Sequence, residues 1–335
     1  MSVFLEKINS LSVLHYKQCK EYKIIIDRLF AGKYLAKTFE EVPFIPVSLF
    51  KELDLKSVPA KDIYRILASS GTQGKQSRIF LTRQNSTEQV KALKHLFQKQ
   101  FGESRVPMVI FDSAKLFRSS THSNARKAAV IGFSSFASER LFVLKDDLTL
   151  DWKALKDFLS VHQNEKIIFF GFTFLIWTTL VLNNESKESF SFPNGIFLHG
   201  GGWKKLDGLG IDKKHFKDKI SEMTGITKIL DYYGMAEQTG SIFFECESGY
   251  FHSTEFSTVL IRDPYSFLPL SHKKTGLVQL ISSLPTSYPG HSILTQDLGT
   301  IFGENDCSCK KSGKYFAIEA RLPNSQVRGC SDVGL

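Results

Sequence analysis

A serine- and glycine-rich segment is the first candidate for binding a phosphate group. It reads Ser69-Ser70-Gly71-Thr72-Gln73-Gly74-Lys75 and follows the apolar run of residues 63–68. Small hydroxyl residues and glycines let backbone N–H groups and side-chain hydroxyls surround a phosphate. The segment lacks the G-x-x-x-x-G-K-[ST] spacing of a Walker A loop. Because an ordinary turn has the same composition, the segment alone leaves both interpretations open.

Two later segments each place a carboxylate after an apolar stretch. In Tyr232-Tyr233-Gly234-Met235-Ala236-Glu237, an aromatic ring can stack on a base, and Glu237 can hold Mg²⁺ against phosphates. In Thr295-Gln296-Asp297-Leu298-Gly299, Asp297 can accept hydrogen bonds from ribose hydroxyls. Taken singly, the glutamate also fits the surface start of a helix, and the aspartate also fits a turn.

Four residues form a pattern that fits a metal ion. Five cysteines are too few for a disulfide scaffold in a chain of 335 residues. However, Cys246 and His252 form one short-range pair, and Cys307 and Cys309 form another. Three cysteines and one histidine are a standard ligand set for structural Zn²⁺, so the sequence predicts a zinc site there. The alternative is free thiols and a surface histidine, since the spacing is not that of a zinc finger.

The elements that must position these residues follow from apolar periodicity. Strands are predicted at residues 63–68, 78–81, 106–111, 142–144, 166–170, 195–199 and 227–232, and helices at 11–31, 86–101, 152–161, 174–182 and 213–224. After Gly240 only strands are predicted, at residues 258–262, 277–282 and 300–302. We therefore expect an α/β body over residues 1–240, a β-rich subdomain over 241–320, and a flexible tail over 321–335.

Composition excludes several classes of protein. Hydrophobic residues make up 42% and charged residues 23%, which is typical of a globular chain and not of a disordered one. The net charge of +9 suits anionic substrates such as nucleotides, but no nucleic-acid motif is present. The N-terminus has no signal-peptide pattern. The longest apolar run, residues 167–182, is shorter than the ~20 residues of a membrane-spanning helix. We therefore expect a cytoplasmic protein.

The three motifs, in this order, resemble those of the adenylate-forming superfamily. That family has S-S-G-T-T-G-x-P-K, Y-G-M-T-E and T-G-D-x-G where this chain has its phosphate loop, Tyr233–Glu237 and Thr295–Gly299. Within the superfamily, the chain is most similar to LuxE-type acyl-protein synthetases. The segments that carry this resemblance are Leu198-His199-Gly200-Gly201-Gly202-Trp203-Lys204, Ser287-Tyr288-Pro289-Gly290-His291-Ser292-Ile293-Leu294-Thr295 and Arg328-Gly329-Cys330-Ser331-Asp332.

This resemblance implies a fold and a first reaction. The fold would be the large adenylate-forming domain without the separate C-terminal domain that carries a lysine in acyl-CoA synthetases. A carboxylic acid, with a fatty acid favoured, would react with ATP and Mg²⁺ to give acyl-AMP. The implied site comprises Glu237 and Arg321 as catalytic residues, and Ser69, Ser70, Gly71, Thr72, Gly74, Gly201, Gly202, Tyr233, Gly234 and Asp297 around the nucleotide.

The resemblance also implies a second step at the tail. In LuxE-type proteins a cysteine near the C-terminus receives the fatty acyl group as a thioester, and Cys330 matches that cysteine. The neighbouring Arg328 would favour the thiolate. The acyl group would then pass to a partner such as an acyl reductase. Taken alone, Cys330 could equally be a tail thiol without a role.

One departure from the family pattern keeps other functions open. Gln76-Ser77 replaces the Pro-Lys of the family's loop, so Lys75 or Arg78 would have to supply the cation. The alternatives are an acyl- or aryl-CoA ligase that uses CoA directly, and a non-catalytic nucleotide-binding protein on this fold. The sequence gives neither the acyl chain length, nor the pathway, nor the oligomeric state.

Overall fold

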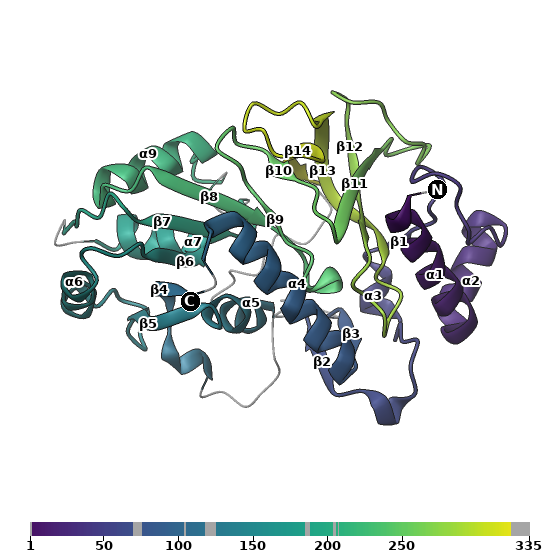
Figure 1. Cartoon of the computed structure of the whole chain (residues 1–335), viewed down its shortest axis with the longest axis horizontal. Helices are drawn as coiled ribbons and strands as arrows, with labels where there is room; N and C mark the ends of the chain where they lie inside the picture. The colour runs from purple at the N-terminus through teal and green to yellow at the C-terminus, as the bar shows by residue number, and fades with distance from the viewer. Residues whose placement is uncertain are drawn as a thin grey trace. The chain divides into compact units, whose positions relative to one another are not determined.

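The computed structural model describes residues 2–69, 76–103, 105–117, 125–184, 188–203, 206 and 208–322 (Figure 1). The chain forms two compact units. The first, which we call the antiparallel unit, comprises Met1–Leu96 and Gly234–Gln326. The second, the parallel unit, comprises Phe97–Tyr233 among the described residues. The N-terminal residues thus belong to the same unit as the β-rich region near the C-terminus.

The parallel unit contains five strands of a six-stranded sheet, in the order β5-β4-β6-β7-β8. All of these neighbours pair in parallel. The strands are β4 (Val106–Ser113), β5 (Ala137–Leu144), β6 (Ile168–Phe172), β7 (Ile196–Gly200) and β8 (Lys228–Tyr233). The connections include α5 (Ala125–Ser134), α6 (Trp152–Val161), α7 (Thr173–Trp177) with a π-helical extension (Thr178–Leu182), and α9 (Lys213–Thr224). Every residue of β4, β6 and β7 is buried, as expected of a parallel sheet covered on both faces.

Phenylalanine accounts for much of the interior of the parallel unit. Phe169 and Phe197 stack with ring centroids 5.3 Å apart, and Phe133 and Phe170 lie 4.5 Å apart. These rings are almost completely shielded from solvent. Each buried aromatic ring removes a large apolar area from water, and offset ring pairs add a further attraction. Part of the high phenylalanine content is therefore structural core.

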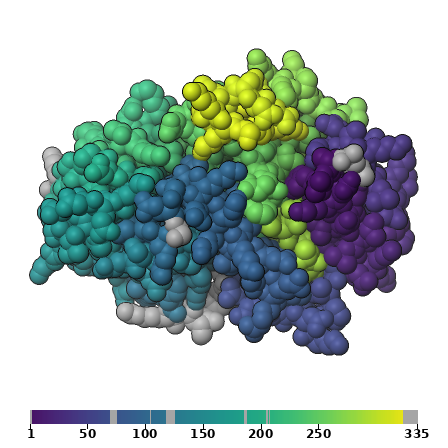
Figure 2. Space-filling model, in the orientation of Figure 1, coloured from purple at the N-terminus to yellow at the C-terminus, as the bar shows by residue number. Residues whose placement is uncertain are grey.

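The antiparallel unit contains a sheet with the order β10-β14-β13-β12-β11. Its strands are β10 (Phe251–His252), β11 (Ser257–Arg262), β12 (Thr275–Ser282), β13 (Ser292–Glu304) and β14 (Lys314–Arg321). The short β1 (Ile45–Pro46) adds to β13 in parallel, and β2 (Arg65–Ala68) pairs with β3 (Arg78–Leu81) as a separate hairpin. The chain connecting β13 to β14, drawn in yellow, lies at the molecular surface (Figure 2).

Helices and one short strand make up the remaining elements of the described chain. Helices α1 (Val3–Gln18), α2 (Lys20–Phe30) and α3 (Leu49–Glu52) precede the hairpin, and α4 (Arg83–Phe101) begins directly after it. One-turn helices occupy Ala60–Asp62 in the antiparallel unit, Ala114–Phe117 in the parallel unit, and Ala236–Gln238, and β9 is the short strand Phe243–Phe244. Within the described residues, no helix is both long enough and apolar enough to span a membrane.

Local signals predicted some elements correctly and others with the wrong limits. Helices 152–161 and 213–224 are confirmed residue for residue. The helix expected over residues 11–31 is two helices, because Cys19 adopts an extended conformation between them. Helix α4 begins three residues earlier than expected, and at its start the Thr82 hydroxyl accepts from the N–H of Asn85. The strand expected at 300–302 is the end of the much longer β13.

Candidate functional site

The two ends of the predicted phosphate loop are joined by the β2–β3 hairpin. Ala68 pairs with Arg78 across the hairpin. Beyond this pair, the Ser69 N–H donates to the carbonyl of Ser77 at 3.1 Å, and the Ser77 N–H donates to the Ser69 hydroxyl at 3.0 Å. The loop therefore begins and ends at one place, as a loop that wraps a phosphate must. Its residues Ser70, Gly71, Thr72, Gly74 and Lys75 lie outside the described residues.

Arg78, one of the two cations considered for this loop, has a partner elsewhere. Its guanidinium lies 2.5 Å from Asp54, and both side chains are about half exposed. A role for Arg78 at a phosphate would require this ion pair to break. Exposed ion pairs contribute about 0–1 kcal/mol, so the obstacle is small.

The segment Ser287–Ser292 connects the loop hairpin to the rest of the unit. The Ser287 hydroxyl lies 2.7 Å from the carbonyl of Phe80 in β3 and 2.9 Å from the side-chain oxygen of Asn85 in α4. The Asn85 amide donates to the carbonyl of Leu284 at 2.7 Å. Ser287 and Tyr288 are buried. Buried polar groups that satisfy one another hold segments in one arrangement, so this segment fixes where β3 delivers the loop.

Glu237 lies in the one-turn helix Ala236–Gln238, and the same segment holds that turn. The Gln238 amide donates to the carbonyls of Gly290 at 2.8 Å and Leu280 at 3.1 Å. A Cβ on Gly290 would stand 2.7 Å from the carbonyl oxygen of Glu237 and 2.3 Å from the Tyr288 ring. Burial, with the nearby Glu237 charge, raises the pKa of Tyr288 far above its usual value. Tyr288 is therefore an uncharged side chain beside the mostly buried carboxylate of Glu237.

Asp297 and Arg321 face each other across neighbouring strands. They are register partners in β13 and β14, and the Arg321 Nε lies 3.5 Å from an Asp297 oxygen. The Thr295 hydroxyl accepts from the Asp297 N–H at 3.1 Å and donates to the carbonyl of Val278 in β12 at 2.8 Å. Asp297 therefore lies in a strand and not in a turn, with a cation beside it and both side chains partly exposed. Such a pair can meet a ribose or a phosphate.

In the parallel unit, the predicted glycines and aromatic residue end two neighbouring strands. Gly200 in β7 is in register with Tyr232 in β8, so Gly201, Gly202 and Tyr233 continue from adjacent carboxyl ends. A Cβ on Gly200 would stand 2.3 Å from the Tyr232 ring, whereas one on Gly202 would meet nothing within 4 Å. Gly201 has φ +106°, which favours glycine. Ligands of open α/β sheets bind beyond the carboxyl ends of the strands, where these residues are.

A buried polar cluster beneath these glycines had no role assigned from the sequence. The Thr173 hydroxyl donates to the carbonyl of Gly200 at 3.1 Å and lies 3.0 Å from the Nδ1 of His199. The Trp203 indole donates to Asp231 in β8 at 3.2 Å. Burial, reinforced by lysines on α9, holds the pKa of His199 well below its ordinary value. The L-H-G-G-G-W segment was the available signal, but Thr173 and Asp231 are far from it in sequence.

The four predicted metal ligands converge in the antiparallel unit. The ligand atoms of Cys246, His252, Cys307 and Cys309 all lie within 4.8 Å of one another. The Sγ of Cys309 is 3.3 Å from the Nε2 of His252. All but Cys309 are buried, and the three cysteines carry free thiols. The predicted acceptor Cys330 lies outside the described residues.

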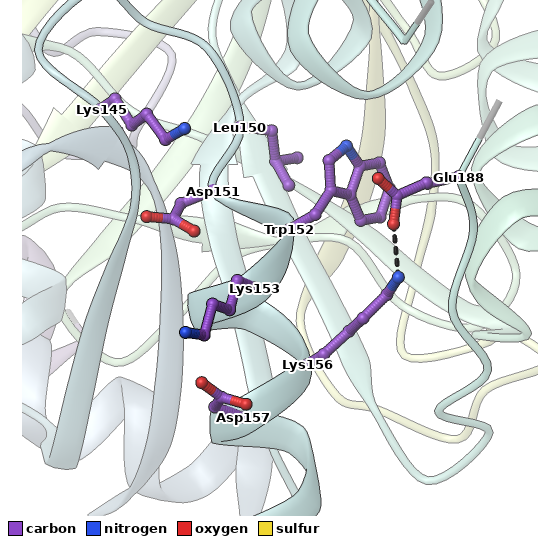
Figure 3. A pocket seen from close by; sticks show the side chains of 8 residues that line it. All are labelled: Lys145, Leu150, Asp151, Trp152, Lys153, Lys156, Asp157 and Glu188. Carbon is purple, nitrogen blue, oxygen red and sulfur yellow. Dashed lines mark hydrogen bonds and ion pairs between the residues drawn. The ribbon is translucent and has the colours of Figure 1, made fainter. Parts of the chain in front are cut away.

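An open depression of about 520 Å³ lies elsewhere on the parallel unit (Figure 3). Lysine and acidic side chains line it, together with Leu150 and Trp152, and Lys156 pairs with Glu188 across it. None of the residues predicted for the site contributes to it. Its charges are exposed to solvent, so it lacks the apolar enclosure that holds a small ligand.

The fold is that of adenylate-forming ligases. The chain superimposes on 2-hydroxyisobutyryl-CoA ligase in complex with 2-HIB-AMP with a TM-score of 0.73 at 15% identity, over 95% of this chain and 67% of that one. For ATP-bound MatB from Rhodopseudomonas palustris the TM-score is 0.50 at 15% identity, over 79% of this chain and 49% of that one. The antiparallel and parallel sheets described above therefore have the same fold as those of these ligases.

The family follows from the sequence as a whole. The model of the acyl-protein synthetase family LuxE matches residues 3–334, so the chain belongs to that family and is a ligase. It is 25% identical to the long-chain-fatty-acid–luciferin-component ligase of Aliivibrio fischeri over 95% of this chain and 84% of that protein. It is 22% identical to the protein of the same name from Vibrio harveyi, over 95% and 83%.

Proposed function

We propose that this protein joins a long-chain fatty acid to AMP and then carries the acyl group on Cys330. In the first step a carboxylate oxygen attacks the α-phosphorus of ATP, and pyrophosphate leaves. In the second, the Cys330 thiolate attacks the acyl carbonyl, AMP leaves, and the thiol proton goes to solvent. The family, the ligase names of its relatives and the adenylate-forming fold support the first step. The position of Cys330 in the matched R-G-C-S-D segment supports the second.

The observation that carries the proposal is that the buried segment Ser287–Ser292 contacts or continues into three parts of the site. Ser287 binds β3, which ends the loop. Gly290 binds the turn of Glu237, and Ser292 begins the strand of Asp297. Glu237 would hold Mg²⁺, Asp297 the ribose, and Arg321 developing phosphate charge. Preorganised charge of this kind stabilises a phosphoryl-transfer transition state without rearrangement.

In the parallel unit, Gly201, Gly202 and Tyr233 are the residues that we propose contact the nucleotide. A Cβ on Gly202 would meet nothing within 4 Å, so its backbone lies beside open space, and Tyr233 offers a ring for the adenine. Gly234, which follows Tyr233, would let the chain pass close to the base. Because the reaction consumes ATP, we place it in the cytoplasm, and we expect an acyl reductase or another acyl-acceptor protein as the partner.

Intact mass after incubation with ATP, Mg²⁺ and fatty acids of graded length tests the proposal. We expect an adduct of one acyl group that neutral hydroxylamine removes and that Cys330→Ser lacks, whereas Cys19→Ser retains it. Fatty-acid-dependent pyrophosphate release should survive in Cys330→Ser at the first turnover. Rapid acyl-CoA formation by Cys330→Ser would instead identify a CoA ligase. Absence of acid-dependent pyrophosphate release from the wild-type protein would identify a non-catalytic nucleotide-binding protein.

A further inference from the structure

The cysteine and histidine cluster is formed by two tight turns. In one, the Cys246 N–H donates to the carbonyl of Tyr250 at 2.8 Å and the Gly249 N–H donates back to that of Cys246 at 2.9 Å. In the other, the Lys310 N–H donates to the carbonyl of Cys307 at 2.9 Å. The hydroxyls of Ser248 and Ser308 lie 2.7 Å apart, so the tips of the turns touch. Residues about 60 positions apart in sequence are thereby brought to one point.

The size and chemistry of the cluster fit one tetrahedral ion. Bonds of about 2.3 Å to sulfur and 2.0–2.1 Å to nitrogen place tetrahedral ligand atoms roughly 3.5–3.8 Å apart. The four ligand atoms here lie within 4.8 Å of one another, so small side-chain rotations close the set. Soft thiolates with one imidazole select Zn²⁺ over Mg²⁺ or Ca²⁺. Three buried or half-buried thiols and an imidazole at one point have no other use in the proposed reaction.

We propose that Cys246, His252, Cys307 and Cys309 bind one Zn²⁺ that fastens β10 to the β13–β14 hairpin. Strand β10 is short and lies at the sheet edge, where two register pairs, Phe251 with Phe316 and His252 with Tyr315, join it to β14. The ion removes three thiol protons on binding and stabilises only the folded arrangement.

We call the four ligands Cys246, His252, Cys307 and Cys309 with their ion the zinc clip, and its position also bears on the proposed nucleotide site. The chain from Glu237 passes through β9 into the Cys246 turn. The hairpin that carries Cys307 and Cys309 also carries Asp297 in β13 and Arg321 in β14. The zinc clip therefore joins the segment that leaves the Glu237 turn to the hairpin that presents Asp297. This consequence rests on the proposed function, whereas zinc binding itself does not.

Metal analysis of the full chain, purified without a polyhistidine tag, tests zinc binding. We expect about one Zn²⁺ per chain. Cys246→Ser and Cys309→Ser should lower it at least fivefold, and Cys19→Ser, a buried cysteine outside the cluster, should leave it unchanged. Co²⁺ added to metal-depleted wild-type protein should give the intense absorption of tetrahedral cobalt with thiolate ligands. Less than a tenth of an equivalent of zinc together with no such cobalt spectrum would overturn the site, as would stoichiometric iron in place of zinc.

Amide hydrogen exchange tests the fastening without reference to activity. After a chelator removes the metal, residues 245–253 and 305–313 should exchange at least tenfold faster, while β4 and β6 in the parallel unit should not change. Restoring Zn²⁺ should restore protection. Unchanged exchange in the two turns after verified metal loss would refute the clip, even if fatty-acid activation is intact.

Discussion

The interactions that stabilise the interior differ between the two units. The parallel unit relies on stacked rings between buried strands, as in Phe169 with Phe197. The antiparallel unit also has apolar clusters, such as Phe44 with Leu277 and Leu294, and in addition buried polar side chains join distant segments in it. Asn85 and Ser287 lie 202 positions apart, and His15 and the carbonyl of Pro285 lie 270 positions apart. A hydrogen bond fixes the separation of two atoms more narrowly than apolar packing does, so these bonds hold the motif-bearing segments of the antiparallel unit in place.

The tryptophans make this comparison measurable. Trp152, Trp177 and Trp203 are the only tryptophans of the chain, and all belong to the parallel unit. Fluorescence therefore reports on that unit, and far-ultraviolet circular dichroism reports on both. Each variant below is expected to move one signal more than the other.

The largest loss of stability should follow Phe197→Ala. This fully buried ring contacts Phe111 and Phe169, so its removal leaves a cavity in the parallel unit. We expect the free energy of unfolding to fall by about 3–5 kcal/mol, seen as a lower urea midpoint of tryptophan fluorescence. Phe197→Leu, which keeps much of the volume, should lose less than half as much. Equal losses for both variants would show that packing does not dominate this unit.

Acid should weaken the antiparallel unit through its buried histidines. His15 is completely buried between Ser57 and the carbonyl of Pro285, and it stacks on His291 at 4.9 Å. Burial lowers the pKa of His15 from 6.5 to about 4 and also lowers that of His291. Between pH 6.5 and 4 the unfolded chain binds the extra proton. Stability is therefore full above 6.5 and falls as the pH drops, by about 3 kcal/mol for His15 alone.

The measurement is the urea midpoint by circular dichroism at pH 7.5, 6.5, 5.5 and 5.0. His15→Gln should flatten the fall between pH 6.5 and 5, after its own loss of stability at neutral pH is subtracted. His272→Gln, at an exposed histidine, should leave the fall unchanged. A wild-type midpoint that rises as the pH drops through this range would contradict the assignment.

The fold was predictable where the signals were local. Helices α6 and α9 have aspartate caps, Asp151 and Asp212, and α9 ends at Gly225 with φ +66°, so their limits follow from the sequence. The break at Cys19 was not predictable, since apolar spacing continues through it and only one residue leaves the helical conformation. The length of strand β13 was underestimated because residues such as the aspartate and glycine of T-Q-D-L-G are common in turns. In the structure, β12 and β14 pair with β13 at this segment.

The candidate site was predictable as motifs but not as an arrangement. Motif order pointed to Glu237, Asp297 and the glycines, and the cysteine and histidine spacing pointed to ligands that do converge. The hydrogen bonds from Ser287 and Gln238 were not predictable, because polar residues show no periodicity that reveals a distant partner. The buried polar cluster of Thr173, His199 and Asp231 was not predicted for the same reason.

Substitutions at two glycines, one in each unit, are expected to have smaller effects on stability. Gly290→Ala should cost about 1–3 kcal/mol, because its Cβ would press on the Glu237 carbonyl and the Tyr288 ring. Gly202→Ala should change stability by less than about 0.5 kcal/mol, since its Cβ enters open space. Circular dichroism in urea gives both values. Comparable losses from both would show that the segment at residues 287–292 is no tighter than the glycine turn.

The same pair of variants separates folding from ligand binding. If Gly202 borders the nucleotide, alanine there should raise the KM for ATP in fatty-acid-dependent pyrophosphate release while stability stays unchanged. Gly290→Ala should instead lower kcat, because it displaces Glu237. An unaltered KM in Gly202→Ala would remove that glycine from the proposed site.

The smallest effect is expected at the depression in Figure 3. Lys156→Ala breaks an ion pair with Glu188 in which the lysine side chain is 55% exposed. Solvent screens such pairs, so stability should change by less than about 1 kcal/mol and pyrophosphate release should be unchanged. The result matters because none of the residues predicted for the site lines this depression. A tenfold loss of activity in Lys156→Ala, with fluorescence-detected stability intact, would contradict this expectation. It would place part of the substrate site at this surface.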